Sequence, residues 1–438
     1  MEARRRSRLI LEYELLWPRT MKRISMTFLI GVILSSAALT LVGRAQGPQG
    51  AHDFIVVFHG DERDVDGLAT EHARAYGASV SHRYHAALKG YAATIPLARL
   101  DDVRRDPRVA FVSEDRPVAA VAQTLPTGID RIDGDLSSHF SSNAWNNIAV
   151  AVIDTGSGPH SDLNVVGGTN CSTGRSFSDG NGHGTHVAGT IGATNNGAGV
   201  VGVAPGIPIY SVRVLNNQGS GSWSSVVCGI DWVTANASQL NIKVANMSLG
   251  GAGTDDGNCG NSNNDALHRA ICNSVAAGVT YVVAAGNDNS NLAGFVPAAY
   301  DEVLAVTAMA DFNGRPGGGA AATCRSDVDD TPADFSNFAG IGSQDANHTI
   351  AAPGVCILST WKGGGYNTIS GTSMASPHVA GAAALCIATG NCPGSPSNVV
   401  SKLRVEASVQ GSAYGFSGDP DSPIGDRYYG YLIAARSY

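Results

Sequence analysis

Three short segments of the sequence carry residue types that together could form a hydrolytic site. Asp154 follows an apolar run, His183 lies in the glycine-rich segment GHGTHVAG, and Ser373 lies in GTSMASPHVAG. A serine nucleophile needs a base to take its proton and a carboxylate to orient that base. A serine at the start of a helix also lies beside backbone N–H groups that can stabilise an oxyanion. The chain order Asp, His, Ser is one of the known triad arrangements.

Each of these residues also has a simpler interpretation when taken alone. An aspartate after a strand is most often a helix or turn cap, and Ser373 alone is typical of an N-cap. His183 and His186 are three residues apart and could bind a metal, but no H-E-x-x-H pattern accompanies them. The three segments are specific only in combination, in this order and with these flanking residues.

The elements that must position these side chains are apolar strands followed by glycine-rich turns. Uncharged apolar runs at 148–153, 244–249 and 280–285 each end at such a turn and alternate with helix-like segments. Unbroken apolar strands that alternate with helices indicate a mostly parallel sheet with helices on both faces. Catalytic groups collect beyond the carboxyl ends of such strands. Asp154, Ser248 and Asn287 fall there, so we predict an α/β fold.

Composition divides the chain near residue 121 and excludes some classes of function. The 438 residues carry a formal net charge of −8, which disfavours nucleic-acid binding. Residues 1–121 hold 17 basic against 14 acidic residues, whereas 122–438 hold 12 against 23 and contain all eight cysteines. We therefore expect two domains.

The N-terminus predicts export. Lys22 and Arg23 precede an uncharged stretch at 24–43, and small residues surround a possible cleavage site after Ala45. This is the pattern of a signal peptide over residues 1–45, with Met21 as an alternative start; an uncleaved membrane anchor is the other interpretation. Export favours disulfides. Short separations make Cys259–Cys272 and Cys386–Cys392 the simplest pairs.

The first domain has the pattern of a small α+β module. Strand-like segments at 53–58, 92–95 and 109–114 alternate with helix-like segments at 65–78 and 96–106. This β-α-β-α-β order suits an open sandwich with an antiparallel sheet.

The three chemical segments resemble the signature segments of the subtilisin-like serine proteases, over about residues 122–438. The resemblance implies that Asp154 orients the base, His183 is the general base and Ser373 is the nucleophile. His186 matches a non-catalytic position. Asn287 matches the side-chain amide of the oxyanion hole, which acts with the backbone N–H of Ser373.

Two further segments match the strands that hold an extended polypeptide substrate in this family. They comprise Gly219, Ser220 and Gly221 on one side and Ser248, Leu249 and Gly250 on the other. Backbone pairing of this kind binds peptides with little side-chain selection. Because no acidic residue is evident there, we expect a broad specificity that favours apolar residues.

The first domain resembles the inhibitory propeptide of the same family. This implies a propeptide domain at 46–121 that inhibits its own peptidase domain at 122–438, with the cut near Val121–Ala122. We expect a self-processing zymogen that is secreted and monomeric, without stable membrane association.

A calcium-binding loop is also implied by the resemblance. The segment 194–200 follows His183 at the spacing of such a loop, and its oxygen ligands suit Ca²⁺. The implied ligands of this structural ion are Gln123, Asp162, Thr194, Asn196, Ala198 and Val200. An ordinary Asn-Gly turn is the alternative. Catalysis needs no cofactor.

Two other functions compete with a secreted serine endopeptidase. A catalytically silent relative could serve as a binding or scaffold protein, although all four catalytic residues are present. An esterase of the α/β-hydrolase type is disfavoured, because the nucleophile lacks G-x-S-x-G and the triad order differs.

Overall fold

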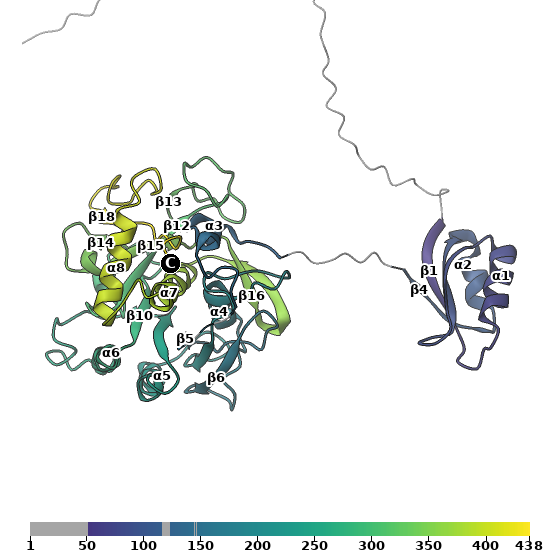
Figure 1. Ribbon diagram of the computed structural model, residues 1–438, viewed down its shortest axis with the longest axis horizontal. Coiled ribbons are helices and arrows are strands. Elements are labelled where there is room, and N and C mark those ends of the chain that lie inside the picture. The colour runs from purple at the N-terminus through teal and green to yellow at the C-terminus, as the bar shows by residue number, and fades with distance from the viewer. Residues whose placement is uncertain (1–50, 116–122, 144, 146) are drawn as a thin grey trace, which may run out of the picture. The chain divides into compact units, whose positions relative to one another are not determined.

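A computed structural model describes residues 51–115, 123–143, 145 and 147–438 (Figure 1). The chain divides into two compact units, at residues 1–118 and 119–438. The predicted signal peptide at 1–45 and the predicted cleavage site at Val121–Ala122 lie outside the described residues. Within the described ranges, no helix is both long and apolar enough to cross a lipid bilayer.

The first unit is a four-stranded antiparallel sheet with two helices. Its elements are β1 (Ala51–Phe58), α1 (Val65–Tyr76), β2 (Ser79–Tyr84), β3 (Gly90–Pro96), α2 (Leu97–Arg105) and β4 (Val109–Glu114). The strand order is β2-β3-β1-β4. The α+β class was predicted, but β2 was not. It is a polar edge strand with no buried residue, so neither alternation nor an apolar run marks it.

The second unit is built on an eight-stranded sheet. Seven strands lie in the order β13-β12-β10-β8-β5-β7-β6, and β15 also pairs with β12. Every pairing is parallel except that of β12 with β13. The strands are β5 (Ala149–Asp154), β6 (Val165–Asn170), β7 (Ile209–Arg213), β8 (Ile242–Met247), β10 (Thr280–Ala284), β12 (Leu304–Ala310), β13 (Thr331–Pro332) and β15 (Thr349–Pro353). The prediction of a mostly parallel sheet is confirmed.

Helices cover both faces of this sheet, as the unbroken apolar strands predicted. Successive side chains of a strand point to opposite faces, so Val150 and Val152 join one core cluster while Ala151 and Ile153 join the other. The first cluster contains side chains of α4 (His183–Gly192), α7 (Thr372–Ala388) and α8 (Pro396–Ser408). The second contains side chains of α5 (Trp223–Asn236) and α6 (Ala266–Ala276).

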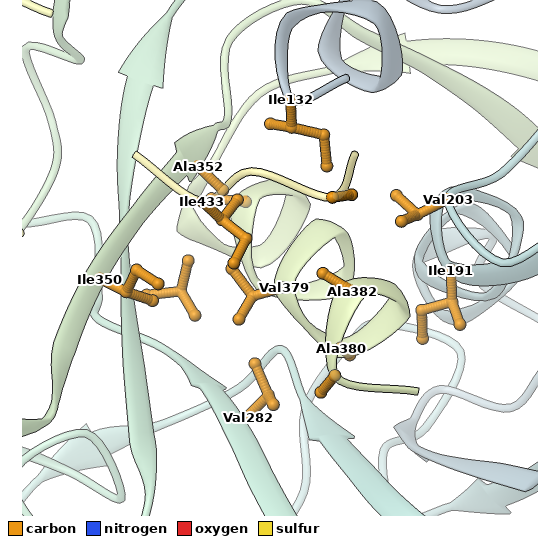
Figure 2. Packing of buried hydrophobic residues seen from close by; sticks show 14 of the residues in the cluster. Ile132, Ile191, Val203, Val282, Ile350, Ala352, Val379, Ala380, Ala382 and Ile433 are labelled. Carbon is orange, nitrogen blue, oxygen red and sulfur yellow. The ribbon is translucent and has the colours of Figure 1, made fainter. Parts of the chain in front are cut away.

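Helix α7, which carries the expected nucleophile Ser373 in its first turn, runs through the first core cluster. Val379 and Ala380 lie among side chains of the sheet such as Val282 and Ile350, while Ile191 of α4 lies on another side of the helix (Figure 2). All of these side chains are fully buried. Burying one valine or isoleucine side chain contributes about 1.5–3 kcal/mol. The packing therefore fixes the position of the helix that carries Ser373.

Shorter elements and four disulfides complete the second unit. The elements are α3 (Thr127–Arg131), β9 (Gly251–Ala252), β11 (Phe295–Val296), β14 (Ala339–Gly340), β16 (Ile357–Trp361), β17 (Gly365–Ile369), β18 (Arg427–Tyr428) and 3₁₀ turns at Gly134–Leu136, Leu292–Gly294, Asp345–His348 and Lys362–Gly364. Both predicted disulfides, Cys259–Cys272 and Cys386–Cys392, are present. Cys171–Cys228 and Cys324–Cys356 form the remaining two, across 57 and 32 residues.

Candidate active site

Asp154 and His183 form a directly hydrogen-bonded pair at the carboxyl end of β5. The Nδ1 atom of His183 lies 2.8 Å from Oδ1 and 3.0 Å from Oδ2 of Asp154. The carboxylate is fully buried, whereas the His183 side chain is 26% exposed. Burial lowers the pKa of His183, but the charge and hydrogen bond of Asp154 outweigh it, so the pKa lies above its ordinary value. The Nδ1–H bond fixes the tautomer and leaves Nε2 as a proton acceptor.

Asp179 holds the turn and the helix start that carry this pair, and the sequence prediction missed it. Its Oδ1 accepts the hydroxyl of Thr155 and the N–H of Gly182, both at 2.9 Å. Its Oδ2 accepts the N–H of Thr185 at 2.9 Å. A carboxylate at the first turn of α4 is favourable because the helix presents unpaired N–H groups there. An aspartate just ahead of a helix start was the available signal.

Ser373 lies in the first turn of α7 and exchanges two hydrogen bonds with Ser248. The hydroxyl of Ser373 donates to the carbonyl of Ser248 at 3.2 Å, and the hydroxyl of Ser248 donates to the carbonyl of Ser373 at 2.8 Å. Pro377 lies inside the helix, four residues after Ser373, and has no N–H to donate to that carbonyl. The proline therefore frees the Ser373 carbonyl to accept the Ser248 hydroxyl.

A buried asparagine extends this connection between β8 and α7. The side-chain amide of Asn246 donates to the hydroxyl of Ser248 at 2.9 Å, and its oxygen accepts the hydroxyl of Ser376 at 2.8 Å. Asn246 and Ser376 are both fully buried. Satisfied buried hydrogen-bond networks of this kind fix a single geometry. Sequence reasoning did not assign either residue, because their relation appears only when the strand end meets the helix start.

Asn287 lies at the end of β10 and faces the start of α7. Its Oδ1 accepts the backbone N–H of Thr372 at 2.8 Å and the hydroxyl of Thr372 at 3.0 Å. Gly286 donates its N–H to the same hydroxyl at 3.1 Å. With the amide oxygen held in this way, the Nδ2 donor of Asn287 is directed away from Thr372. Asn287 is exposed, whereas Thr372 is fully buried.

The six predicted substrate-binding residues line one cleft of about 810 Å³, with His183 also in its wall. Gly219, Ser220 and Gly221 contribute one part of the lining, and Ser248, Leu249 and Gly250 contribute another. Leu215, Trp223 and Val226 add apolar surface. Among the described residues that line this cleft, none is an aspartate, glutamate, lysine or arginine.

All six predicted calcium ligands make hydrogen bonds within the set. The Nε2 atom of Gln123 donates to the carbonyls of Thr194, at 2.8 Å, and Val200, at 3.0 Å. Asp162 accepts the side-chain amide of Asn196 at 3.1 Å and the N–H of Val200 at 3.3 Å. Two backbone carbonyl oxygens thus converge on the side-chain N–H groups of Gln123, which carry a partial positive charge. Converging oxygens of this kind are what a bound cation requires.

The loop that supplies these oxygens is tightly packed against Asp162. Gly199 has φ of +63°, and a Cβ atom there would collide with the carboxylate of Asp162 and the hydroxyl of Tyr366. Tyr366 donates its hydroxyl to Asp162 at 2.8 Å, a contact that the sequence did not predict. Ala198, the sixth predicted ligand, donates its N–H to the side-chain oxygen of Asn196 at 2.9 Å. The donor set of carboxylate, carbonyl and amide oxygens fits Ca²⁺.

An Asp–His pair, a serine at a helix start and a side-chain amide at the edge of a parallel sheet together define the class of serine hydrolases. Comparisons with known proteins narrow this class. A profile of the Subtilase family matches residues 146–428, and a profile of the peptidase inhibitor I9 family matches residues 53–120. The chain therefore belongs to the subtilase family and is a serine endopeptidase preceded by an I9-type propeptide domain.

Individual relatives agree with the family match. Subtilisin DY from Bacillus licheniformis is 41% identical over 272 residues, which cover 61% of this chain and 85% of the relative. Subtilisin NAT from Bacillus subtilis subsp. natto is 39% identical over 303 residues, or 68% and 70% of the two chains. A solved structure of a cold adapted subtilisin-like serine proteinase superposes with a TM-score of 0.52 at 31% identity, covering 70% of this chain and 97% of that one.

Proposed function

We propose that this chain is a secreted serine endopeptidase, made as a self-processing zymogen, in which Asp154, His183 and Ser373 form the catalytic triad. The observation that carries the proposal is the 2.8 Å bond from His183 Nδ1 to buried Asp154, at the wall of the cleft that Ser248 also lines. Ser248 in turn holds the hydroxyl of Ser373. His183, which Asp154 orients, and Ser248, which accepts the Ser373 hydroxyl, thus line one cleft, and this supports the proposed triad.

In the acylation step, rotation about its Cα–Cβ bond turns the Ser373 hydroxyl from Ser248 toward His183. Oγ attacks the scissile carbonyl carbon and forms a C–O bond, while its proton passes to Nε2 of His183. Asn287 Nδ2 and the backbone N–H of Ser373 donate to the oxyanion. The C–N bond then breaks, and His183 returns the proton to the departing amine.

Deacylation repeats the same chemistry with water as the nucleophile. Water gives one proton to His183 and attacks the ester carbon, and the C–O bond to Ser373 breaks as the hydroxyl regains its proton. Asp154 remains ionised throughout and stabilises the imidazolium formed in each half-reaction. No cofactor takes part in these steps.

Extended polypeptides are the substrates that suit the cleft. The residues at 219–221 and 248–250 line the same space, and five of these six positions are glycine or serine, which lets a peptide backbone approach closely. Leu215, Trp223 and Val226 provide an apolar wall without a fixed charge. We infer a broad specificity that favours apolar side chains on the acyl side of the cut.

The order of the segments along the chain also suggests the role of each part of the protein. Residues 1–45 act as the signal peptide, 46–121 as the inhibitory propeptide and 122–438 as the peptidase domain, which works as a monomer. The I9 match at 53–120 supports the second assignment. The signal-peptide pattern at the N-terminus supports an extracellular location.

The oxygen-rich region around Asp162 holds a structural Ca²⁺ in this proposal. Gln123, Asp162 and Asn196 supply side-chain oxygens, and the carbonyls of Thr194, Ala198 and Val200 supply the rest. Turning the Gln123 amide by 180° exchanges its nitrogen for its oxygen at the same place. The bound ion joins the mature N-terminus to the body of the domain.

Hydrolysis of an extended peptide anilide with apolar residues tests the proposed activity. The processed chain should cleave it, Ser373→Ala should not, and Ser370→Ala, three residues earlier in the same segment, should remain active. If the processed wild-type chain binds the peptide but leaves it intact, the alternative of a catalytically silent binding protein is correct.

A further inference from the structure

The disulfide loop that follows the peptide-binding strand encloses a histidine that the proposed mechanism does not use. Asp255 and Asp256 follow β9, Cys259 pairs with Cys272, and His268 lies on α6 between the two cysteines. His268 is fully buried and stacks on the ring of Tyr300, with centroids 4.0 Å apart and planes within 2°. This packing holds the imidazole in one orientation.

The two ring nitrogens of His268 have different surroundings. Nε2 lies 2.9 Å from Oε2 of Glu302, which accepts its proton. Nδ1 is buried and makes no hydrogen bond. It nevertheless lies 3.4 Å from Oδ1 of Asp255 and 3.2 Å from Oδ1 of Asp256. A buried lone pair that faces two carboxylate oxygens requires something positive between them.

The geometry matches a metal site. Two ligands bound to Zn²⁺ at about 2.0–2.1 Å across a tetrahedral angle lie about 3.3 Å apart, close to both distances from Nδ1. A metal-binding histidine usually donates its other N–H to a carboxylate, which is the role of Glu302. The loop also fixes Asp256, since its carboxylate accepts the N–H groups of Gly260 and Ser262 at 2.9 and 2.7 Å.

The chemistry of the donors selects among cations. The sulfurs of Cys259 and Cys272 are bonded to each other and are not thiolate ligands. One imidazole nitrogen and two carboxylate oxygens remain, and their ligand atoms lie within 4.8 Å of one another. An imidazole ligand suits Zn²⁺ and similar transition metals, whereas Ca²⁺ and Mg²⁺ prefer oxygen alone.

We propose that His268 Nδ1, Asp255 Oδ1 and Asp256 Oδ1 bind a divalent transition-metal ion of the zinc type, with Glu302 orienting the imidazole. The ion clamps the loop at 254–265 onto α6. Because Gly250 lines the substrate cleft and β9 begins at the next residue, the clamp fixes the continuation of that peptide-binding segment. This site is separate from the oxygen-rich region around Asp162.

Zinc content of the full chain tests the proposal. All variants carry Ser373→Ala to prevent autolysis and are kept in excess Ca²⁺, so that oxygen sites remain filled. After removal of trace metals, the chains are dialysed against micromolar Zn²⁺ and bound zinc is counted by mass spectrometry. We expect the parent chain to hold one zinc ion more than Asp255→Asn or His268→Gln. Asp301→Asn, a carboxylate outside the ligand set, should match the parent.

Two further measurements distinguish the loss of a zinc ligand from a general disturbance of the fold by the substitution. Zn²⁺ should raise the unfolding temperature of the parent and of Asp301→Asn, but not that of Asp255→Asn. Glu302→Gln should weaken zinc affinity about 10–100-fold. If His268→Gln does not fold, Asp255→Asn decides the question, because that side chain is 18% exposed. Equal zinc in Asp255→Asn and the parent overturns the proposal, and Nδ1 then carries a proton instead.

Discussion

The side-chain oxygen of Asn287 accepts two hydrogen bonds from Thr372, one from its backbone N–H at 2.8 Å and one from its hydroxyl at 3.0 Å. Thr372 directly precedes Ser373, so consecutive residues orient the amide of Asn287, which is the proposed oxyanion donor, and carry the proposed nucleophile. The amide of Asn287 is thereby held in one of its two orientations. The orientation of the Asn287 amide consequently depends on Thr372, which is fully buried.

Thr372→Val should lower kcat while leaving KM nearly unchanged. The substitution keeps the shape but removes the hydroxyl bond, worth about 0.5–1.5 kcal/mol, so the loss should be roughly tenfold or less. Asn287→Ala should lower kcat by a factor on the order of 10²–10³, the range known for the equivalent donor in subtilisin. Thr372→Ser should retain most activity. Steady-state kinetics on the four chains check this, and an unchanged kcat in Asn287→Ala would remove that residue from the oxyanion hole.

The pH dependence of kcat/KM should report the titration of His183. The imidazole must be neutral to accept a proton, and its pKa is raised because Asp154 outweighs the opposing effect of burial. Activity should therefore be lost as pH falls through a value above about 6.5. Asp154→Asn should move this limb to lower pH and lower kcat on the order of 10⁴. An acid limb at the same pH in both proteins would contradict the pairing.

Calcium should govern the lifetime of the processed enzyme rather than its turnover. An ion that binds only the folded state stabilises it by about 2.7 kcal/mol at a hundredfold excess over Kd. EGTA should therefore shorten the active half-life on warming, and Ca²⁺ should restore it. Asp162→Ala should behave like the chelated enzyme, whereas Asp231→Ala, an exposed carboxylate on α5, should respond like wild type. A half-life indifferent to EGTA would leave the segment at 194–200 as an ordinary turn.

Maturation should depend on the chain's own nucleophile. Ser373→Ala is expected to retain the propeptide, so that its sequence begins near residue 46, whereas the active chain should begin near Ala122. N-terminal sequencing of secreted material distinguishes the two products. Normal maturation of Ser373→Ala would mean that another protease makes the cut or that Ser373 is not the nucleophile.

The fold was predictable because its signals are local. The apolar run that forms β5 and the residues flanking Ser373 are contiguous in the chain. Short separation also identified Cys259–Cys272 and Cys386–Cys392. Cys171 and Cys228 lie 57 residues apart, and their pairing depends on how a strand end meets α5. Strand β2 was missed because most of its residues are polar and none of them is buried.

The supporting residues of the site were not predicted, because the contacts that define their roles are not local in the sequence. Asp179, Asn246 and Thr372 act through contacts that exist only after folding. The side chains of Asn246 and Thr372 do not suggest catalysis in isolation. Aspartate, asparagine and threonine are also common in turns, where they hydrogen-bond to nearby backbone. Sequence thus identified the groups proposed to do chemistry, and the structure adds the groups that hold them.

The most direct test of the proposed mechanism is the site of reaction with a fluorophosphonate. This reagent phosphonylates a serine only when a neighbouring base activates it. The processed chain should carry one adduct, which peptide mass spectrometry places on Ser373, and His183→Ala should carry none although its Ser373 is intact. Absence of an adduct on the folded, processed wild-type chain, or an equal adduct in His183→Ala, would contradict the triad of Asp154, His183 and Ser373.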